Sequence, residues 1–217
     1  MAKQARSQLT HNRILGSAAT EFARHGYLHA NLQQVAARIG LTKGALYGHF
    51  GSKKLLAEAL VAQLDDLLRA FPPEPGPDGS TPAVDGLRSL TCSLADRIES
   101  DVRINAALRL VLDEAQTTLE PPAFLANLRQ HSLDLVDRAQ RADGPCPALP
   151  GGPVADLTVS LLVGAYCTAP AADRSGLAVR VRGMWDVLVP ALTAPGPPER
   201  HTPPSPPALG DRSQTAR

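Results

Sequence analysis

Residues 31–50, NLQQVAARIGLTKGALYGHF, predict two short helices separated by a glycine turn. One face of the first helix is apolar, because its apolar residues recur at spacings of three and four: Leu32, Val35, Ala36 and Ile39. Asn31 precedes this helix as an N-cap, and Gly40 follows it where a left-handed residue is needed. Thr42 can cap the second helix. This is the pattern of a helix-turn-helix, whose second helix enters the major groove of DNA.

The surface of the two helices supplies the candidate DNA contacts. Small residues allow close approach of the backbone, and basic or amphipathic residues can reach phosphates and base edges. The residues expected at the DNA are Asn31, Gln33, Thr42, Lys43, Gly44, Ala45, Tyr47, His49 and Lys53. Spacing alone leaves an ordinary helical hairpin as the alternative.

Charge is distributed unevenly along the chain. Residues 1–64 carry eight Lys and Arg against two Glu, a net charge of +6, whereas residues 65–217 carry −5 and the whole chain +1. Three of the four lysines flank the second helix: Lys43, Lys53 and Lys54. Such asymmetry favours a nucleic-acid-binding N-terminal part. A basic solvated face, or a protein partner for this part, remains open.

Composition narrows the class of protein. The 217 residues are 43% hydrophobic, without a run of apolar residues long enough to cross a membrane and without a secretory signal pattern. Cys92, Cys146 and Cys167 are odd in number and match no metal-binding spacing. We expect a cytoplasmic protein with reduced thiols, no metal and no cofactor; a redox switch is the lesser alternative.

The rest of the chain predicts helices and no strands, so the fold class is all-α. A three-helix head (1–51) is joined by a long helix, beginning at residue 52, to a helical body (52–193), and a proline-rich tail (194–217) is expected to be disordered. The helices expected from apolar spacing are 14–26, 52–71, 84–98, 102–116, 121–144, 154–169 and 174–193. Proline-rich loops are expected at 72–82 and 144–153.

Three stretches resemble a known family. ILGSAATEFARHGY (14–27), the helix-turn-helix and FGSKKLLAEAL (50–60) together resemble the DNA-binding domain of TetR-family transcriptional regulators over residues 9–64. LTKGALYGHFGSK (41–53), VRINAALRLVLDEA (102–115) and VRGMWDVLVPAL (181–192) are similar to the γ-butyrolactone receptor branch of actinomycetes. Two positions depart from that branch. Gly48 replaces an aromatic residue, and the only tryptophan, Trp185, lies in the last helix instead of mid-body.

The body is expected to dimerise and to bind a small ligand. Residues 154–169 are apolar around most of their circumference, and 177–192 carry an apolar stripe ending in Trp185 and Leu188, so a four-helix bundle with a second copy would cover both. A single intrachain core is the alternative.

Mostly apolar walls with a few polar groups suit a small hydrophobic ligand. The candidate lining is Leu90, Thr91, Leu94, Leu108, Leu112, Gln116, Phe124, Leu128, Val159, Leu162 and Tyr166.

The resemblance implies a ligand-released repressor that binds palindromic operator DNA as a homodimer and controls antibiotic biosynthesis. Its signal would be a γ-butyrolactone, butenolide or furan. A regulator of an efflux or resistance gene, responding to an antibiotic or intermediate, is the alternative. An enzyme is the rival of a different class, but no nucleophile elbow, zinc-protease motif, P-loop or dinucleotide fingerprint marks a catalytic site.

Overall fold

The computed structural model describes residues 2–71, 82–141, 150–169 and 174–193, and within these ranges the chain is helical without a strand. The head holds α1 (Ala2–His29), α2 (Leu32–Arg38) and α3 (Lys43–Phe50), and α4 (Lys53–Ala70) leads into the body. The body adds α5 (Pro82–Ser100), α6 (Val102–Ala115), α7 (Ala123–Arg141), α8 (Gly151–Thr168) and α9 (Leu177–Thr193). In the described ranges, no helix is apolar over a length that would cross a bilayer.

The predicted caps of the head helices are confirmed. Asn31 Oδ1 accepts a hydrogen bond from the Gln33 amide at 2.9 Å, and Thr42 Oγ1 accepts one from the Ala45 amide at 3.1 Å. Gly40 between them has φ +72°, a conformation that glycine adopts without a steric penalty. Ser52 Oγ likewise caps α4. Side-chain caps and one glycine therefore fix the geometry of the helix-turn-helix.

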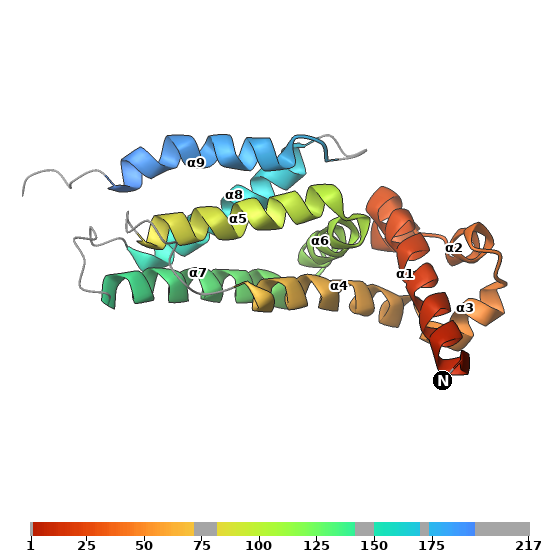
Figure 1. Ribbon diagram of the computed structural model, residues 1–217. Coiled ribbons are helices and arrows are strands. Elements are labelled where there is room, and N and C mark those ends of the chain that lie inside the picture. Colours follow the sequence, from red (N-terminus) through yellow and green to blue (C-terminus); the bar gives the residue numbers. More distant parts are fainter. Residues whose placement is uncertain (1, 72–81, 142–149, 170–173, 194–217) are drawn as a thin grey trace, which may run out of the picture.

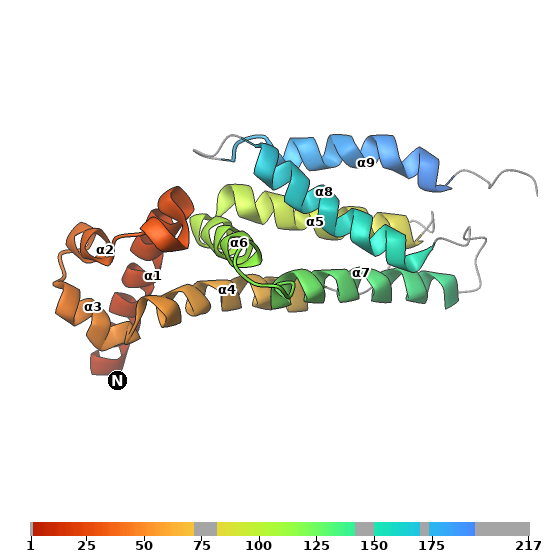
Figure 2. The same ribbon diagram turned by 180° about the vertical axis from the view of Figure 1, so that it is seen from behind.

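The head and the body lie at opposite ends of an elongated molecule (Figure 1). The long α4 leaves the head and runs toward α7. On the opposite side of the body from these two helices lies α9, with α5 and α8 in between (Figure 2). The crossing helix α6 packs against both α1 and α4. Its contact with α1 is the most extensive between any two helices of the described chain. The head is thus held by α6 as well as by its covalent link through α4.

Several predicted boundaries are wrong. The helix α1 runs from Ala2 to His29, with a kink at Gly26, instead of from 14 to 26, and other helices differ by a few residues. Pro82 begins α5 instead of ending a loop, and α8 begins at Gly151 instead of 154. Pro153 fits there because the first turn of a helix leaves its amides unpaired, so the missing N–H costs nothing. The last helix begins at Leu177 instead of 174, because Arg174 and Gly176 both have positive φ. The predicted segments 72–81, 142–149 and 194–217 lie outside the described residues.

The position of Trp185 differs from the one expected, because this residue of the apolar stripe on 177–192 does not face a second copy of the chain. The indole is fully buried inside its own chain, and its Nε1 donates to Thr91 Oγ1 at 2.6 Å. Thr91 in turn donates to the Leu87 carbonyl. Trp185 therefore joins α9 to α5 and does not face a partner, because its apolar surface and its one donor are both used within the chain. The large apolar residues exposed on α9 are Val179, Met184 and Val187.

Candidate nucleic-acid interface

The second helix of the helix-turn-helix, α3, turns most of its surface to solvent. Only Leu46 and Phe50 are buried, and they anchor the helix on the head core. His11 of α1 stacks on Phe50, with ring centroids 4.2 Å apart. Six of the expected DNA contacts are exposed on or beside α3: Thr42, Lys43, Gly44, Ala45, Tyr47 and His49. Their exposure meets the first requirement of a DNA surface, and their contact with DNA stays a prediction.

Room for close approach exists along the same face. A Cβ added at Gly48 would meet no atom within 4 Å, and one at Gly44 would meet only Thr42 Oγ1 at 3.9 Å. The Lys43 ammonium lies 5.8 Å from the centre of the Tyr47 ring, so both side chains share one patch. Asn31 and Gln33 are exposed as well, although the Asn31 carbonyl oxygen is already occupied as the cap of α2.

Lys53, one of the expected DNA contacts, already has partners within the head. Its Nζ donates to the Ala30 carbonyl at 2.8 Å and to the Leu28 carbonyl at 3.3 Å. The same ammonium lies 5.1 Å from the centre of the Tyr27 ring. Burial lowers the pKa of Lys53, and the nearby Glu21 carboxylate opposes that shift. Lys53 therefore ties the start of α4 to the end of α1, and any DNA contact would be additional to that.

Glu21 organises the head and was missed as a functional residue. Its side chain is 2% exposed. Oε1 accepts from the Asn31 amide at 3.0 Å, and Oε2 pairs with Arg38 Nη2 at 3.3 Å. Arg38 also donates to the Ser17 carbonyl. One carboxylate thus fixes both ends of α2 against α1. The sequence did offer one signal for a buried role: Glu21 lies seven residues after Ile14, on the apolar face of the first helix.

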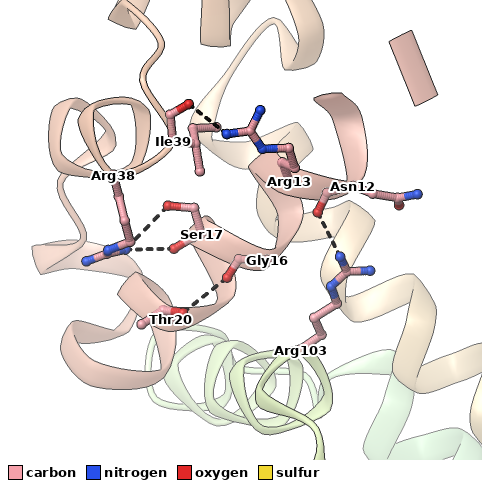
Figure 3. Close-up of a pocket in the computed structure, with 8 residues that line it drawn as sticks. All are labelled: Asn12, Arg13, Gly16, Ser17, Thr20, Arg38, Ile39 and Arg103. Atoms are coloured by element: carbon pink, nitrogen blue, oxygen red, sulfur yellow. Dashed lines mark hydrogen bonds between the residues drawn. The ribbon is translucent and has the colours of Figure 1, made fainter. Parts of the chain in front are cut away.

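A cleft of about 460 Å³ marks the seam between the head and α6 (Figure 3). It is lined by Asn12, Arg13, Gly16, Ser17, Thr20, Arg38, Ile39 and Arg103. Arg103 of α6 donates to the Asn12 carbonyl at 2.7 Å, and Arg13 donates to the Ile39 carbonyl at 3.1 Å. These two arginines therefore connect neighbouring helices by hydrogen bonds: Arg103 links α6 to α1, and Arg13 links α1 to the end of α2.

The expected ligand lining divides into three groups by burial. Eight residues are buried in the body core: Leu90, Thr91, Leu94, Leu108, Phe124, Leu128, Leu162 and Tyr166. Leu112 and Val159 are half-buried. Gln116 is exposed at the C-cap of α6, so it does not lie among the buried residues of the expected lining. Neither the seam cleft nor a smaller cavity between α4 and α7 is lined by these residues.

Tyr166 is already engaged within the body. Its hydroxyl donates to Asn105 Oδ1 at 2.8 Å, and the Arg174 guanidinium lies 3.9 Å from the ring centre. Burial raises the pKa of Tyr166, while the Arg174 charge acts in the opposite direction. A ligand that used this hydroxyl would have to compete with Asn105.

Comparison with known proteins agrees with this architecture. Residues 14–60 match the family described as bacterial regulatory proteins, tetR family. The chain is 29% identical to the A-factor receptor protein of Streptomyces griseus over 197 residues, which cover 90% of this chain and 68% of that protein. None of the compared proteins named here is described as an enzyme.

Solved structures share the fold over most of the chain. CprB, a TetR family protein of Streptomyces coelicolor solved with its operator sequence, is 26% identical, with a TM-score of 0.69 over 85% of this chain and 88% of that one. A γ-butyrolactone receptor described as ArpA-like is 25% identical, with a TM-score of 0.59 over 85% of this chain and 88% of that chain.

Proposed function

We propose that this chain is a TetR-family transcriptional repressor, because residues 14–60 match the family described as bacterial regulatory proteins, tetR family. It would bind a palindromic operator as a homodimer and be released by a small hydrophobic signal. The observation that carries the proposal is the exposed face of α3, with Lys43, Tyr47 and His49 around two unobstructed glycines. This face belongs to a head with a net charge of +6 within residues 1–64. A protein that binds operator DNA would act in the cytoplasm.

We propose that α8 and α9 form the dimer interface. The exposed side of α8 carries Leu157, Gly164 and Cys167, and that of α9 carries Met184 and Val187. Small and apolar residues let helices of two copies approach closely, and the same patch would contact itself across a two-fold axis. The two α3 helices of the dimer would then enter successive major grooves, about 34–36 Å apart.

The proposed signal is a γ-butyrolactone, butenolide or furan, and the controlled genes are those of antibiotic biosynthesis. The similarity to a receptor for A-factor and to a γ-butyrolactone receptor supports this class. The apolar faces of helices α5 to α8 would enclose the ligand, with Tyr166 as the preferred polar contact. Because Leu90, Leu108 and Leu162 are fully buried, ligand entry requires these helices to separate.

Release follows from the way the head is attached. Both α4 and α6 contact α1, so a ligand that displaces either helix within the body moves the head. A ligand that prefers the displaced state must weaken operator binding by the factor with which the operator weakens ligand binding. Coupling of the usual size would lower operator affinity by about 5- to 150-fold.

A gel-shift assay on the DNA upstream of the chain's own gene tests the proposal. We expect a shifted band whose affinity falls steeply with salt, because binding releases counterions from the DNA. Adding an organic extract of the host culture should abolish the shift, and fractionating the extract identifies the compound. Equal affinity for the upstream DNA and a random duplex would contradict operator recognition. Release only by an antibiotic would point to the regulator of a resistance gene.

A further inference from the structure

The helix α1 extends well beyond the segment that matches the family. That segment begins at residue 14, whereas α1 begins at Ala2, so residues 2–13 of the helix lie outside it. We call residues 2–13 the N-terminal extension. The side chains of residues 4–9 are all exposed, and Leu9 is the only large apolar one among them. This part of the helix therefore adds almost nothing to the core of the head, and its role lies at the surface.

The N-terminal extension is basic. It contains Lys3, Arg6 and Arg13 and no Asp or Glu, so it supplies +3 of the net charge of +6 within residues 1–64. Arg6 and Arg13 are exposed, and in the described part of the chain neither pairs with a carboxylate. Cations in the first turns of a helix oppose its dipole, so these charges do not stabilise α1 itself. Their complement is an anionic partner outside the chain.

Two contacts hold the N-terminal extension beside the helix-turn-helix. The ring of His11 stacks on Phe50, the last residue of α3. Arg13 Nη2 donates to the carbonyl of Ile39, at the end of α2. From these contacts the first turns of α1 continue past α3, and the N-terminus lies at the same end of the molecule as α3 (Figures 1 and 2). The basic segment is therefore next to the surface that carries the expected DNA contacts.

The spacing of the two arginines suits a row of phosphates. Seven residues make nearly two turns of a helix, so Arg6 and Arg13 lie on the same side of α1, about 10 Å apart along its axis. Each strand of a DNA duplex carries one phosphate per roughly 3.4 Å of the duplex axis. A guanidinium group presents several N–H donors in a geometry that fits phosphate oxygens. Two arginines at this spacing can each reach a phosphate of one strand.

We propose that the N-terminal extension is an arm that binds DNA phosphates beside the groove that α3 enters, with Arg6 as its principal contact. Arg13 supplies a second charge, and its hydrogen bond to the Ile39 carbonyl keeps the arm in position. Phosphate contacts carry no direct sequence information, so the arm raises the affinity for any duplex. The arm rests on the proposed binding of DNA, but it lies outside residues 31–53, where all the other expected contacts fall.

Fluorescence anisotropy of the full chain, with the upstream operator duplex and a random duplex at several salt concentrations, tests the arm. Arg6→Gln should weaken binding to both duplexes by the same factor, and should reduce the slope of log affinity against log salt by about 1. Arg6→Lys keeps the charge and should keep the slope of the wild type.

Arg24→Gln is the matched control. Arg24 is also exposed on α1 and lies 18 residues after Arg6. That separation is five helical turns, which places it on the same side of the helix but about 27 Å farther along the axis. This variant removes the same charge from the chain, and should leave both the affinity and the slope unchanged.

Three results would overturn the arm: an unchanged affinity and slope in Arg6→Gln, an equal loss in Arg24→Gln, or a loss that Arg6→Lys does not restore. The second would show a general attraction between the head and DNA, and the third a structural role of the side chain. Circular dichroism of each variant checks that its helix content is unchanged. Equal affinity of the wild type for the two duplexes would contradict operator recognition alone, because the random duplex still tests the arm.

Discussion

The backbone amide of Tyr27 donates a 2.7 Å hydrogen bond to Asp113 Oδ2, which joins the end of α1 to α6. Arg109 Nε holds the other carboxylate oxygen at 3.1 Å. Gly26 lies against the same carboxylate, where an added Cβ would come within 2.5 Å of Oδ2. Together with the bond from Arg103 to the Asn12 carbonyl, this contact makes α6 a second connection between the head and the body.

Replacing Asp113 should loosen this connection. Asp113→Ala leaves the Tyr27 amide without its acceptor and should lower the free energy of unfolding by about 1–2 kcal/mol, since both groups are only partly buried. Urea denaturation measures the change. Glu114→Ala is the matched control, because that side chain is exposed on the neighbouring position. Equal stability of the two variants would show that the bond contributes nothing.

Gly26 should not tolerate a side chain. Its φ of +67° and ψ of −176° belong to a region open essentially only to glycine, and the Asp113 carboxylate occupies the space of a Cβ. Gly26→Ala should destabilise the protein by about 1–3 kcal/mol. Gly48→Ala, in a helix with open space around it, should be neutral or stabilising by up to about 1 kcal/mol. A thermal melt of both variants tests the contrast, and the reverse order would contradict it.

Replacing Glu21 should destabilise the protein more than the loss of one exposed ion pair would. Glu21→Ala leaves Arg38 and the Asn31 amide without their shared acceptor, and should cost about 1–3 kcal/mol of stability. Glu58→Ala removes only an exposed pair with Lys54 and should cost at most about 0.5 kcal/mol. The first variant should also lose operator affinity, because α2 positions α3. Unchanged stability in Glu21→Ala would rule out its organising role.

The hydrogen bond between Trp185 and Thr91 should couple α9 to α5. Thr91→Val buries the indole N–H without an acceptor and should cost about 1–3 kcal/mol. Trp185→Phe removes the donor, so the double variant should be less destabilised than the sum of the two single variants. Urea denaturation followed by circular dichroism gives the four free energies. Strict additivity would mean that the bond adds no stability.

Lys43 should contribute to operator specificity. Lys43→Ala should weaken binding to the palindrome by about 1–3 kcal/mol if the ammonium reads a base edge. Its effect on a random duplex should then be much smaller. Fluorescence anisotropy with the two duplexes separates the cases. Equal losses on both would assign Lys43 to a phosphate, and no loss on either would remove it from the interface.

Local signals in the sequence predicted α2 and α3 well, whereas α1 begins at Ala2 instead of residue 14. Asn31, Thr42 and Ser52 cap helices through their own side chains, and Gly40 adopts positive φ as expected, because these interactions involve residues close in sequence. The first residues of α8 and α9 were not predicted correctly. Whether Gly151 and Pro153 join a helix depends on tertiary packing, and helix propensity contains no information about that packing.

The sequence predicted which face of α3 is exposed, but not the long-range contacts that hold the helices of the head in place. Exposure of the α3 face follows from the apolar positions Leu46 and Phe50, which must be buried. Contacts between distant residues, such as Lys53 with the Ala30 carbonyl or Tyr27 with Asp113, have no signature in sequence spacing. Trp185 shows the same limit, because an apolar stripe does not reveal whether its own chain or a partner covers it.

Reciprocal coupling between the operator and the signal is the defining property of a ligand-released repressor. The measurement is the affinity of the compound that releases the operator, determined with the free protein and again with saturating operator duplex. We expect the ligand affinity to fall by about 5- to 150-fold on the operator, equal to the loss of operator affinity that the ligand causes. A ligand affinity that does not change when the operator is bound would contradict a ligand-released repressor.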